Sequence, residues 1–350
     1  MQRDDTIDIV KGVGITLVVL GHSGCPTWLH DFVYQFHMPL FFIASGWFFS
    51  WKKEFKDFAI RKVQTLYIPF VIWSVVFLLL HNIFFKMGIL SAEYGYQGLV
   101  NGLYSWKTII KKTIWIVTTM TQYETSLLGT FWFVRTLFIA LFVLYIPMRV
   151  VERYRKDSLV ALCTIGAIAT LLGGWFAYSG TQWVLKPVID YKVCMALFFI
   201  VLGCLLRRMK SYLTSAPLLI LVTCIVIFTT AIYPTDMAFR GRGLADWIVL
   251  MMAGTAGFIM VYGIIIKMEQ LNSVCIGKYH EAMAWIGKNS FVIMAIHPLL
   301  LKPASFLKVY LCHLPLGMVG YHPVIPENGG VLDGVFSIGY DPVNCVCGDL

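Results

Sequence analysis

The sequence predicts an all-α protein, a polytopic transmembrane helical bundle. Of its 350 residues, 58% are hydrophobic and 13% are charged, and the mean hydropathy is +0.74. Soluble domains carry roughly twice that share of charged residues. Apolar runs recur from residue 7 to residue 301, and no polar block between them is long enough to form a separate domain. We therefore expect one membrane-embedded domain, residues 1–302, followed by a tail, residues 303–350.

Nine stretches approach the roughly 20 apolar residues that an α-helix needs to cross a bilayer. They are, approximately, residues 7–23, 34–51, 65–85, 129–148, 158–178, 189–206, 212–233, 245–267 and 284–301. A short polar turn is expected between the first two. The protein is thus predicted to cross the membrane several times. The boundaries of the spans are placed only to within a few residues.

The basic residues predict the orientation of these spans. Residues 23–35 contain neither lysine nor arginine, whereas alternate loops are basic: Lys52, Lys53, Lys56, Arg61 and Lys62, then Arg149, Arg153, Arg155 and Lys156, then Arg207, Arg208 and Lys210. Short loops rich in lysine and arginine stay in the cytoplasm. The N-terminus is therefore predicted to be cytoplasmic. Because the net charge of +9 is spread over these loops, no nucleic-acid partner is expected.

Two segments lie outside the predicted spans. Residues 86–128 form the longest connection and include a short apolar patch, Ile114 to Met120; this loop is expected to face outside, as a lid or as a plain linker. The tail after residue 302 is rich in glycine and proline and is expected to be weakly ordered. Its Cys345-Val346-Cys347 sequence, with His313 and His322, lacks the ligand spacing of zinc sites, so no metal is predicted.

Ionisable residues in the first span are the strongest indication of function, because a charge in a bilayer is costly. Lys11 and His22 are eleven residues apart, which on an α-helix is about three turns plus 20° and a rise of about 16 Å. Both side chains therefore lie on one face at different depths. A cation can bind the phosphates of a long anionic donor, and a neutral histidine can take a proton from a hydroxyl. Alternatively, Lys11 pairs with Asp8 at the interface and His22 caps the helix end.

Three further residues are candidates for the outer half of the membrane. His37 begins the second span, Arg135 lies about 9 Å inside the fourth, and His297 lies near the outer end of the ninth. Each also has a structural explanation: a histidine at a polar helix junction, an arginine that extends to the interface, and a histidine in the core. Ser45-Gly46 favours close helix packing over a nucleophile.

Together these residues resemble the acyltransferase 3 family of integral membrane O-acyltransferases. The resemblance is carried by Asp8-x-x-Lys11, ten residues, His22, and then Phe36-His37-Met38-Pro39-Leu40-Phe41-Phe42-Ile43-Ala44-Ser45-Gly46. Later matches occur in the same order: Arg61 with Tyr67-Ile68-Pro69, Phe131-Trp132-Phe133, Ile286-Gly287-Lys288-Asn289-Ser290, and His297-Pro298. The resemblance covers roughly residues 5–300.

This resemblance implies transfer of an acyl group, commonly acetyl from acetyl-CoA, to a hydroxyl of a saccharide of the cell envelope, at the bacterial inner membrane. The basic residue and histidine that are essential in the family correspond to Lys11 and His22. The family more often has arginine at the first position, and lysine cannot make the bidentate phosphate contact of arginine. The family also typically has ten spans, against the nine predicted here.

We therefore expect an acyltransferase that binds no cofactor and uses acyl-CoA as co-substrate. Its partners would be the acyl-CoA donor, a saccharide or lipid-linked saccharide acceptor, and the lipid bilayer. From the spacing and the resemblance together we expect general-base or acyl-carrier chemistry at His22, donor binding at Lys11 and Asp8, and acceptor binding or polarisation at His37, Arg135 and His297. Two alternatives remain, a transporter or flippase of an envelope precursor and an inactive or scaffolding relative.

Overall fold

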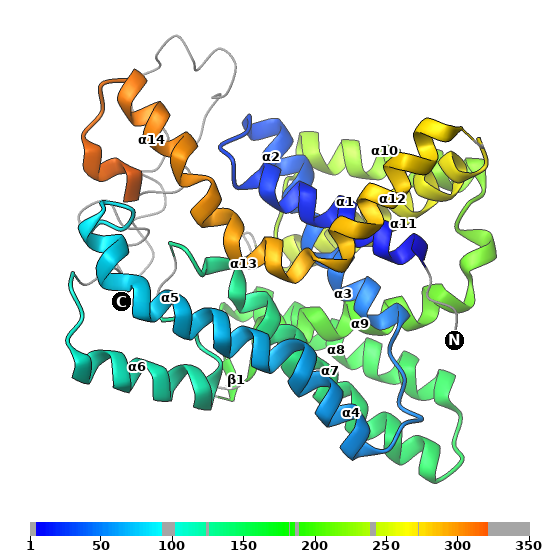
Figure 1. Cartoon of the computed structure of the whole chain (residues 1–350). Helices are drawn as coiled ribbons and strands as arrows, with labels where there is room; N and C mark the ends of the chain where they lie inside the picture. The colour runs from blue at the N-terminus through cyan, green and yellow to red at the C-terminus, as the bar shows by residue number, and fades with distance from the viewer. Residues whose placement is uncertain are drawn as a thin grey trace.

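The computed structural model describes residues 5–92, 102–123, 126–181, 183–185, 189–238, 243–271 and 273–320. In these residues the fold is a bundle of helices with a single two-stranded ribbon (Figure 1). The chain therefore has the predicted all-α architecture. Residues 321–350, which include His322, Cys345 and Cys347 of the predicted tail, lie outside this description.

The first predicted pair of spans contains three helices, α1 (Asp5–Gly21), α2 (Thr27–Tyr34) and α3 (His37–Trp47). The prediction of a polar turn between these spans is wrong, because helix α2 occupies that segment. Pro26 precedes the first helical residue, where its fixed φ favours helix initiation. The apolar residues of α2, at positions 28, 29, 32 and 33, repeat with helical spacing, which is the signal that predicts this helix.

The next span is part of one long continuous helical segment. Helix α4 (Phe55–Lys62) passes through a π-helical turn, Val63–Tyr67, into α5 (Ile68–Lys86). Pro69 explains the wider turn. Proline has no N–H to donate to the carbonyl four residues earlier, and its ring pushes that carbonyl away. The polar N-terminal end of the segment carries the basic residues that predict the cytoplasmic side.

The central part of the chain follows the predicted order. Helix α6 (Trp106–Thr119) lies beside α5 (Figure 1). At one end the Tyr67 hydroxyl donates a hydrogen bond to the Val117 carbonyl at 2.7 Å. At the other end the Asn82 side chain forms hydrogen bonds with the backbone of Tyr104. The apolar patch of the long connection is thus the end of a helix. A 3₁₀ turn, Gly129–Phe131, then leads into α7 (Trp132–Arg153), and α8 (Ser158–Ser179) follows.

The remaining elements begin with a short antiparallel ribbon that pairs Trp183 with Asp190. Their bounds are β1 (Trp183–Leu185), β2 (Ile189–Asp190), α9 (Tyr191–Arg208), α10 (Ala216–Ile232), α11 (Leu244–Glu269), α12 (Val274–Lys288), α13 (Ser290–Leu300) and α14 (Lys302–Leu311), with a final 3₁₀ turn at Leu316–Gly320. The Asp190 side chain caps α9 by accepting from the Val193 N–H at 3.2 Å.

Each of the nine predicted stretches contains helix, but their lengths differ from the prediction. Five helical segments of the described chain are long and apolar enough to cross a membrane: Phe55–Lys86, Gly129–Arg153, Ser158–Ser179, Leu244–Glu269 and Ser290–Leu311. Ala216–Ile232 is a shorter apolar helix. The second stretch is helical only as α3, and the ninth divides at Asn289 between α12 and α13. The count of nine spans and the cytoplasmic N-terminus stay predictions.

Glycines set the closest helix contacts in the bundle. A Cβ at Gly12 of α1 would overlap the Met283 carbonyl of α12, and a Cβ at Gly287 would overlap the Asp8 carbonyl. Likewise, a Cβ at Gly46 of α3 would overlap a backbone carbonyl of α9. The packing interpretation of Ser45-Gly46 is therefore confirmed, and α1 is held against α12 along a backbone-to-backbone contact.

Beyond the predicted domain boundary at residue 302 the chain continues as α14. Lys302 is only 4% exposed, and its ammonium donates to the carbonyls of Val319, at 2.7 Å, and Gly320, at 3.2 Å. These bonds fold the final 3₁₀ turn back onto α14, where Val309 and Val319 pack together. The buried Lys302 ammonium thus holds the described start of the tail against α14. That the tail is a separate region stays a prediction.

Candidate active site

One end of α1 carries an ion pair. The Lys11 ammonium lies 2.6 Å from the Asp8 carboxylate, one turn away, and the side chains are 26% and 3% exposed. Next to it, Lys288 at the end of α12 lies 3.4 Å from Asp5. The alternative that Lys11 pairs with Asp8 is therefore present in the structure. The ammonium nevertheless keeps enough exposure to bind a second anion.

The other end of α1 carries His22. This residue follows the last helical residue, Gly21, and its N–H still donates to the Val18 carbonyl at 3.1 Å, so the helical path continues to it. A Cβ at Gly21 would overlap the ring of Tyr34. The glycine therefore lets α2 lie directly against the end of α1. The predicted separation of Lys11 and His22 along one helix is confirmed.

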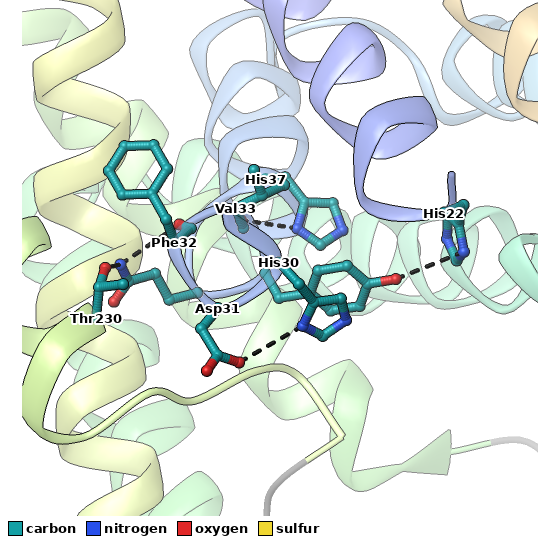
Figure 2. Close-up of polar contacts among 9 residues, drawn as sticks. His22, His30, Asp31, Phe32, Val33, His37 and Thr230 are labelled. Carbon is teal, nitrogen blue, oxygen red and sulfur yellow. Dashed lines mark hydrogen bonds and ion pairs between the residues drawn. The ribbon is translucent and has the colours of Figure 1, made fainter. Parts of the chain in front are cut away.

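Tyr34 is the centre of a group of three histidines. Its hydroxyl lies 3.5 Å from Nδ1 of His22 (Figure 2), and its ring centroid lies 3.7 Å from that of His30 and 4.8 Å from that of His37. His30 in turn lies 3.5 Å from Asp31. Helix α2 thus positions a phenol between the end of α1 and the beginning of α3. We call Tyr34 with His22, His30, His37 and His297 the histidine cluster.

His297 joins the histidine cluster from α13. Its ring centroid lies 5.3 Å from that of His22, with the two planes tilted by 44°. Nδ1 lies 3.0 Å from the Met294 carbonyl and 3.2 Å from the Ile293 carbonyl. The side chain is buried, and its Nε2 has no hydrogen-bond partner among the described residues. The second nitrogen is therefore an unsatisfied polar atom beside His22.

Arg135 lies elsewhere, between α7 and α9. Its Nε donates to the Thr119 carbonyl at 3.2 Å, and its Nη1 lies 3.6 Å from the Asp190 carboxylate. Beside it, the Lys192 ammonium lies over the ring of Trp132, 4.6 Å from the centroid. The guanidinium of Arg135 thus faces a carboxylate of the protein itself. The cations Arg135 and Lys192 and the carboxylate of Asp190 thus lie near the beginning of α7.

The structure brings some predicted site residues together and separates others. His22, His37 and His297 meet around Tyr34, whereas Lys11 and Asp8 lie near the opposite end of α1. His30 was missed because its segment was predicted to be a turn, and Tyr34, at the start of the predicted second span, was not singled out. A signal was available: positions 30, 34 and 37 have the i, i+4, i+7 spacing of one helix face. No comparable signal pairs Asp190 with Arg135.

The arrangement suits proton transfer better than metal binding. A histidine nitrogen that lies beside a carbonyl oxygen must carry the proton, because a carbonyl only accepts. His37, with Nδ1 3.0 Å from the Val33 carbonyl, is therefore a second histidine whose Nδ1 carries a proton. Among the residues that the structure describes, no group of three or more His, Cys, Asp or Glu side chains is arranged to hold a metal ion.

Comparisons with known proteins identify related sequences. The acyltransferase 3 model, described as an acyltransferase domain, matches residues 4–326. Nodulation protein NolL of Mesorhizobium japonicum is 26% identical over 216 residues, which cover 57% of this chain and 48% of NolL. NolL of Sinorhizobium fredii is 31% identical over 131 residues, 33% of each protein. The matches thus span half or less of these relatives. No solved structure matches the chain.

The family match covers most of the chain and includes α1, the histidine cluster and α13. It favours an enzyme over the transporter or flippase that the composition alone left open. Several helices are long and apolar enough to cross a membrane, so the enzyme is a multi-pass membrane protein. The chain belongs to the acyltransferase 3 family, whose model is described as an acyltransferase domain.

Proposed function

We propose that this enzyme transfers an acyl group, acetyl in the first instance, from acyl-CoA to a hydroxyl of a saccharide or glycolipid of the cell envelope. It does so in the bacterial inner membrane, with nine spans and a cytoplasmic N-terminus. The single observation that supports this best is the histidine cluster at the end of α1, where His22 lies beside the Tyr34 hydroxyl and the ring of His297, whose Nδ1 proton is held by a backbone carbonyl. Such groups are suited to general base catalysis near neutral pH.

The reaction is balanced without a cofactor. The imidazole of His22 takes the proton of the acceptor hydroxyl while the hydroxyl oxygen attacks the carbonyl carbon of the thioester. A carbon–oxygen bond forms, and the carbon–sulfur bond breaks. The sulfur leaves as a thiolate and takes the proton from His22, which gives free CoA and the neutral imidazole. The products are the ester of the acceptor and CoA.

Lys11 supplies the donor site in this proposal. Its ammonium lies about 16 Å along α1 from His22, and the extended pantetheine arm of CoA places a comparable length between phosphates and thioester. Because Asp8 already neutralises part of the charge of Lys11, we assign to Asp8 the role of holding the ammonium in place. A lysine binds phosphate as a point charge, so donor affinity depends strongly on ionic strength.

The acceptor would occupy the opposite end. The neutral ring of His37 would present Nε2 as a hydrogen-bond acceptor, which suits a ligand rich in hydroxyls, and His297 lies beside His22 at the same end. Arg135 belongs to the α7–α9 junction and would contribute to the acceptor site from there, together with its partner Asp190. The names of the relatives, both nodulation proteins, do not specify the acceptor.

The test is mass spectrometry of envelope glycans from host cells with the gene, without it, and with His22→Asn. Wild type should add an acyl group that the deletion and His22→Asn both lack. His313→Asn is the matched control, because His313 lies in α14's exposed end region with φ of 53°, which asparagine tolerates. Unchanged acylation in His22→Asn would overturn the proposal. Protection of the purified protein against heat by acetyl-CoA, and not by a transported solute, checks the donor.

A further inference from the structure

Pro298 leaves one backbone carbonyl of α13 without its helical partner. In an α-helix the N–H of residue 298 would donate to the carbonyl of residue 294, and proline has no N–H. Two side chains take its place on the Met294 carbonyl, His297 Nδ1 at 3.0 Å and the Thr130 hydroxyl at 3.3 Å. A carbonyl oxygen has two lone pairs, so these two donors satisfy it.

The same contact fixes the proton of His297. Because the carbonyls of Met294 and Ile293 only accept, Nδ1 must be the protonated nitrogen. The neutral ring then has a lone pair on Nε2. That atom is buried in a residue that is 3% exposed, and it has no partner among the described residues. A buried acceptor without a donor is unfavourable, which points to a donor on a neighbouring group.

The distance to His22 decides which donor fits. An N–H···N hydrogen bond is about 2.9 Å long, and each nitrogen lies about 1.2 Å from its ring centroid, so two directly bonded imidazoles have centroids about 5.3 Å apart. The observed separation is 5.3 Å. A substrate hydroxyl bridging the two rings would need roughly 7 Å. The spacing therefore matches a direct bond between His22 and His297 after a small rotation of the rings.

We propose that Pro298 makes His297 an obligatory hydrogen-bond acceptor for His22. In this arrangement, which rests on the proposed function, Nε2–H of His22 donates to Nε2 of His297. This leaves Nδ1 of His22, the nitrogen beside the Tyr34 hydroxyl, unprotonated and able to take the proton of the acceptor hydroxyl. His297 and Pro298 are thus positioning residues. They select the tautomer of the base and stabilise the imidazolium that forms in the step.

The contacts of His297 suit it to this role. The groups that contact His22 include the Tyr34 hydroxyl on α2 and the His297 ring on α13. His30 and His37 lie around Tyr34, and Asp31 lies beside His30. Tyr34 can either donate or accept, so it does not fix the tautomer of His22 by itself. His297, with its proton held by the backbone, can only accept.

Two substitutions of His297 separate this role from a structural one. His297→Gln keeps an acceptor, because its amide oxygen can face His22, whereas His297→Leu removes it. With purified enzyme and acetyl-CoA, His297→Leu should lower kcat about 100-fold with KM unchanged, and His297→Gln should stay within about tenfold of wild type. The acid limb of the kcat–pH profile should move to lower pH in His297→Leu, because the imidazolium of His22 loses its acceptor.

Pro298→Ala tests the cause of the fixed proton. Alanine restores an N–H that competes for the Met294 carbonyl, so kcat should fall about three- to tenfold while His297 itself is intact. Pro147→Ala is the matched control, because Pro147 also lies inside an apolar helix, α7, away from any of the clustered histidines. It should leave kcat and the pH profile unchanged.

The outcomes are distinguishable. Equal losses in His297→Leu and His297→Gln that follow their thermal stability, or a wild-type kcat in Pro298→Ala, would overturn this inference alone. Full activity of His22→Asn would overturn the proposed function and the inference with it. If His22→Asn is inactive and His297→Leu behaves like wild type, the proposed function is retained and the role of His297 is rejected.

Discussion

The Asp8–Lys11 pair should respond very differently to loss of its two members. The Asp8 side chain is 3% exposed, whereas that of Lys11 is 26% exposed. Lys11→Met leaves a buried carboxylate without its cation, a change that lowers the free energy of unfolding by about 3 kcal/mol. Asp8→Asn leaves an ammonium that can still reach water, and should lower it by about 1 kcal/mol.

The double variant supplies the decisive comparison. Asp8→Asn/Lys11→Met removes both charges together, so its stability should lie within about 1 kcal/mol of wild type, with a coupling energy of about 2–3 kcal/mol between the sites. The assay is thermal unfolding of the detergent-solubilised protein, followed by tryptophan fluorescence. Lys11→Met should lower Tm by roughly 5 °C and the double variant by roughly 2 °C. Lys11→Arg, which keeps the charge, is the control.

A second measurement on the same proteins separates stability from donor binding. Addition of acetyl-CoA should raise Tm in wild type and in Asp8→Asn, and it should not do so in Lys11→Met or the double variant. If Asp8→Asn destabilises the protein as strongly as Lys11→Met, the asymmetry of burial does not govern this pair. If the double variant retains protection by acetyl-CoA, Lys11 is not part of the donor site.

Two further predictions concern packing. Gly203→Ala places a Cβ against the Ile43 carbonyl of α3 and should lower the free energy of unfolding by about 1–3 kcal/mol, measured as a fall in Tm. Gly277→Ala on α12, where a Cβ meets nothing within 4 Å, is its control and should leave Tm equal or slightly higher. The buried Gln35 amide bonds the Val226 carbonyl and the Thr230 hydroxyl of α10. Gln35→Leu should therefore lower stability by about 1–3 kcal/mol, and an unchanged Tm would contradict this assignment.

The sequence predicted well what repeats along the chain. Hydropathy identified the apolar helices, and a helical rise placed Lys11 and His22 at two ends of α1. The small residue Gly46 correctly indicated a close helix contact. The prediction was wrong between residues 23 and 34, where a helix of eight residues, too short to be a span, was taken for a turn. That error removed His30 from the candidate site.

The sequence by itself determined the local chemistry of this protein: an all-helical membrane chain, ionisable residues within apolar helices, and a proline placed after His297. These features depend on residue type and on spacing within one element. Only the tertiary structure decided which elements meet, because a contact between residues 22 and 297, or between residues 135 and 190, leaves no trace in helical periodicity. Helix packing joined His297 to His22 and gave Arg135 to Asp190. The pairing of side chains at the site is therefore a property of the folded bundle.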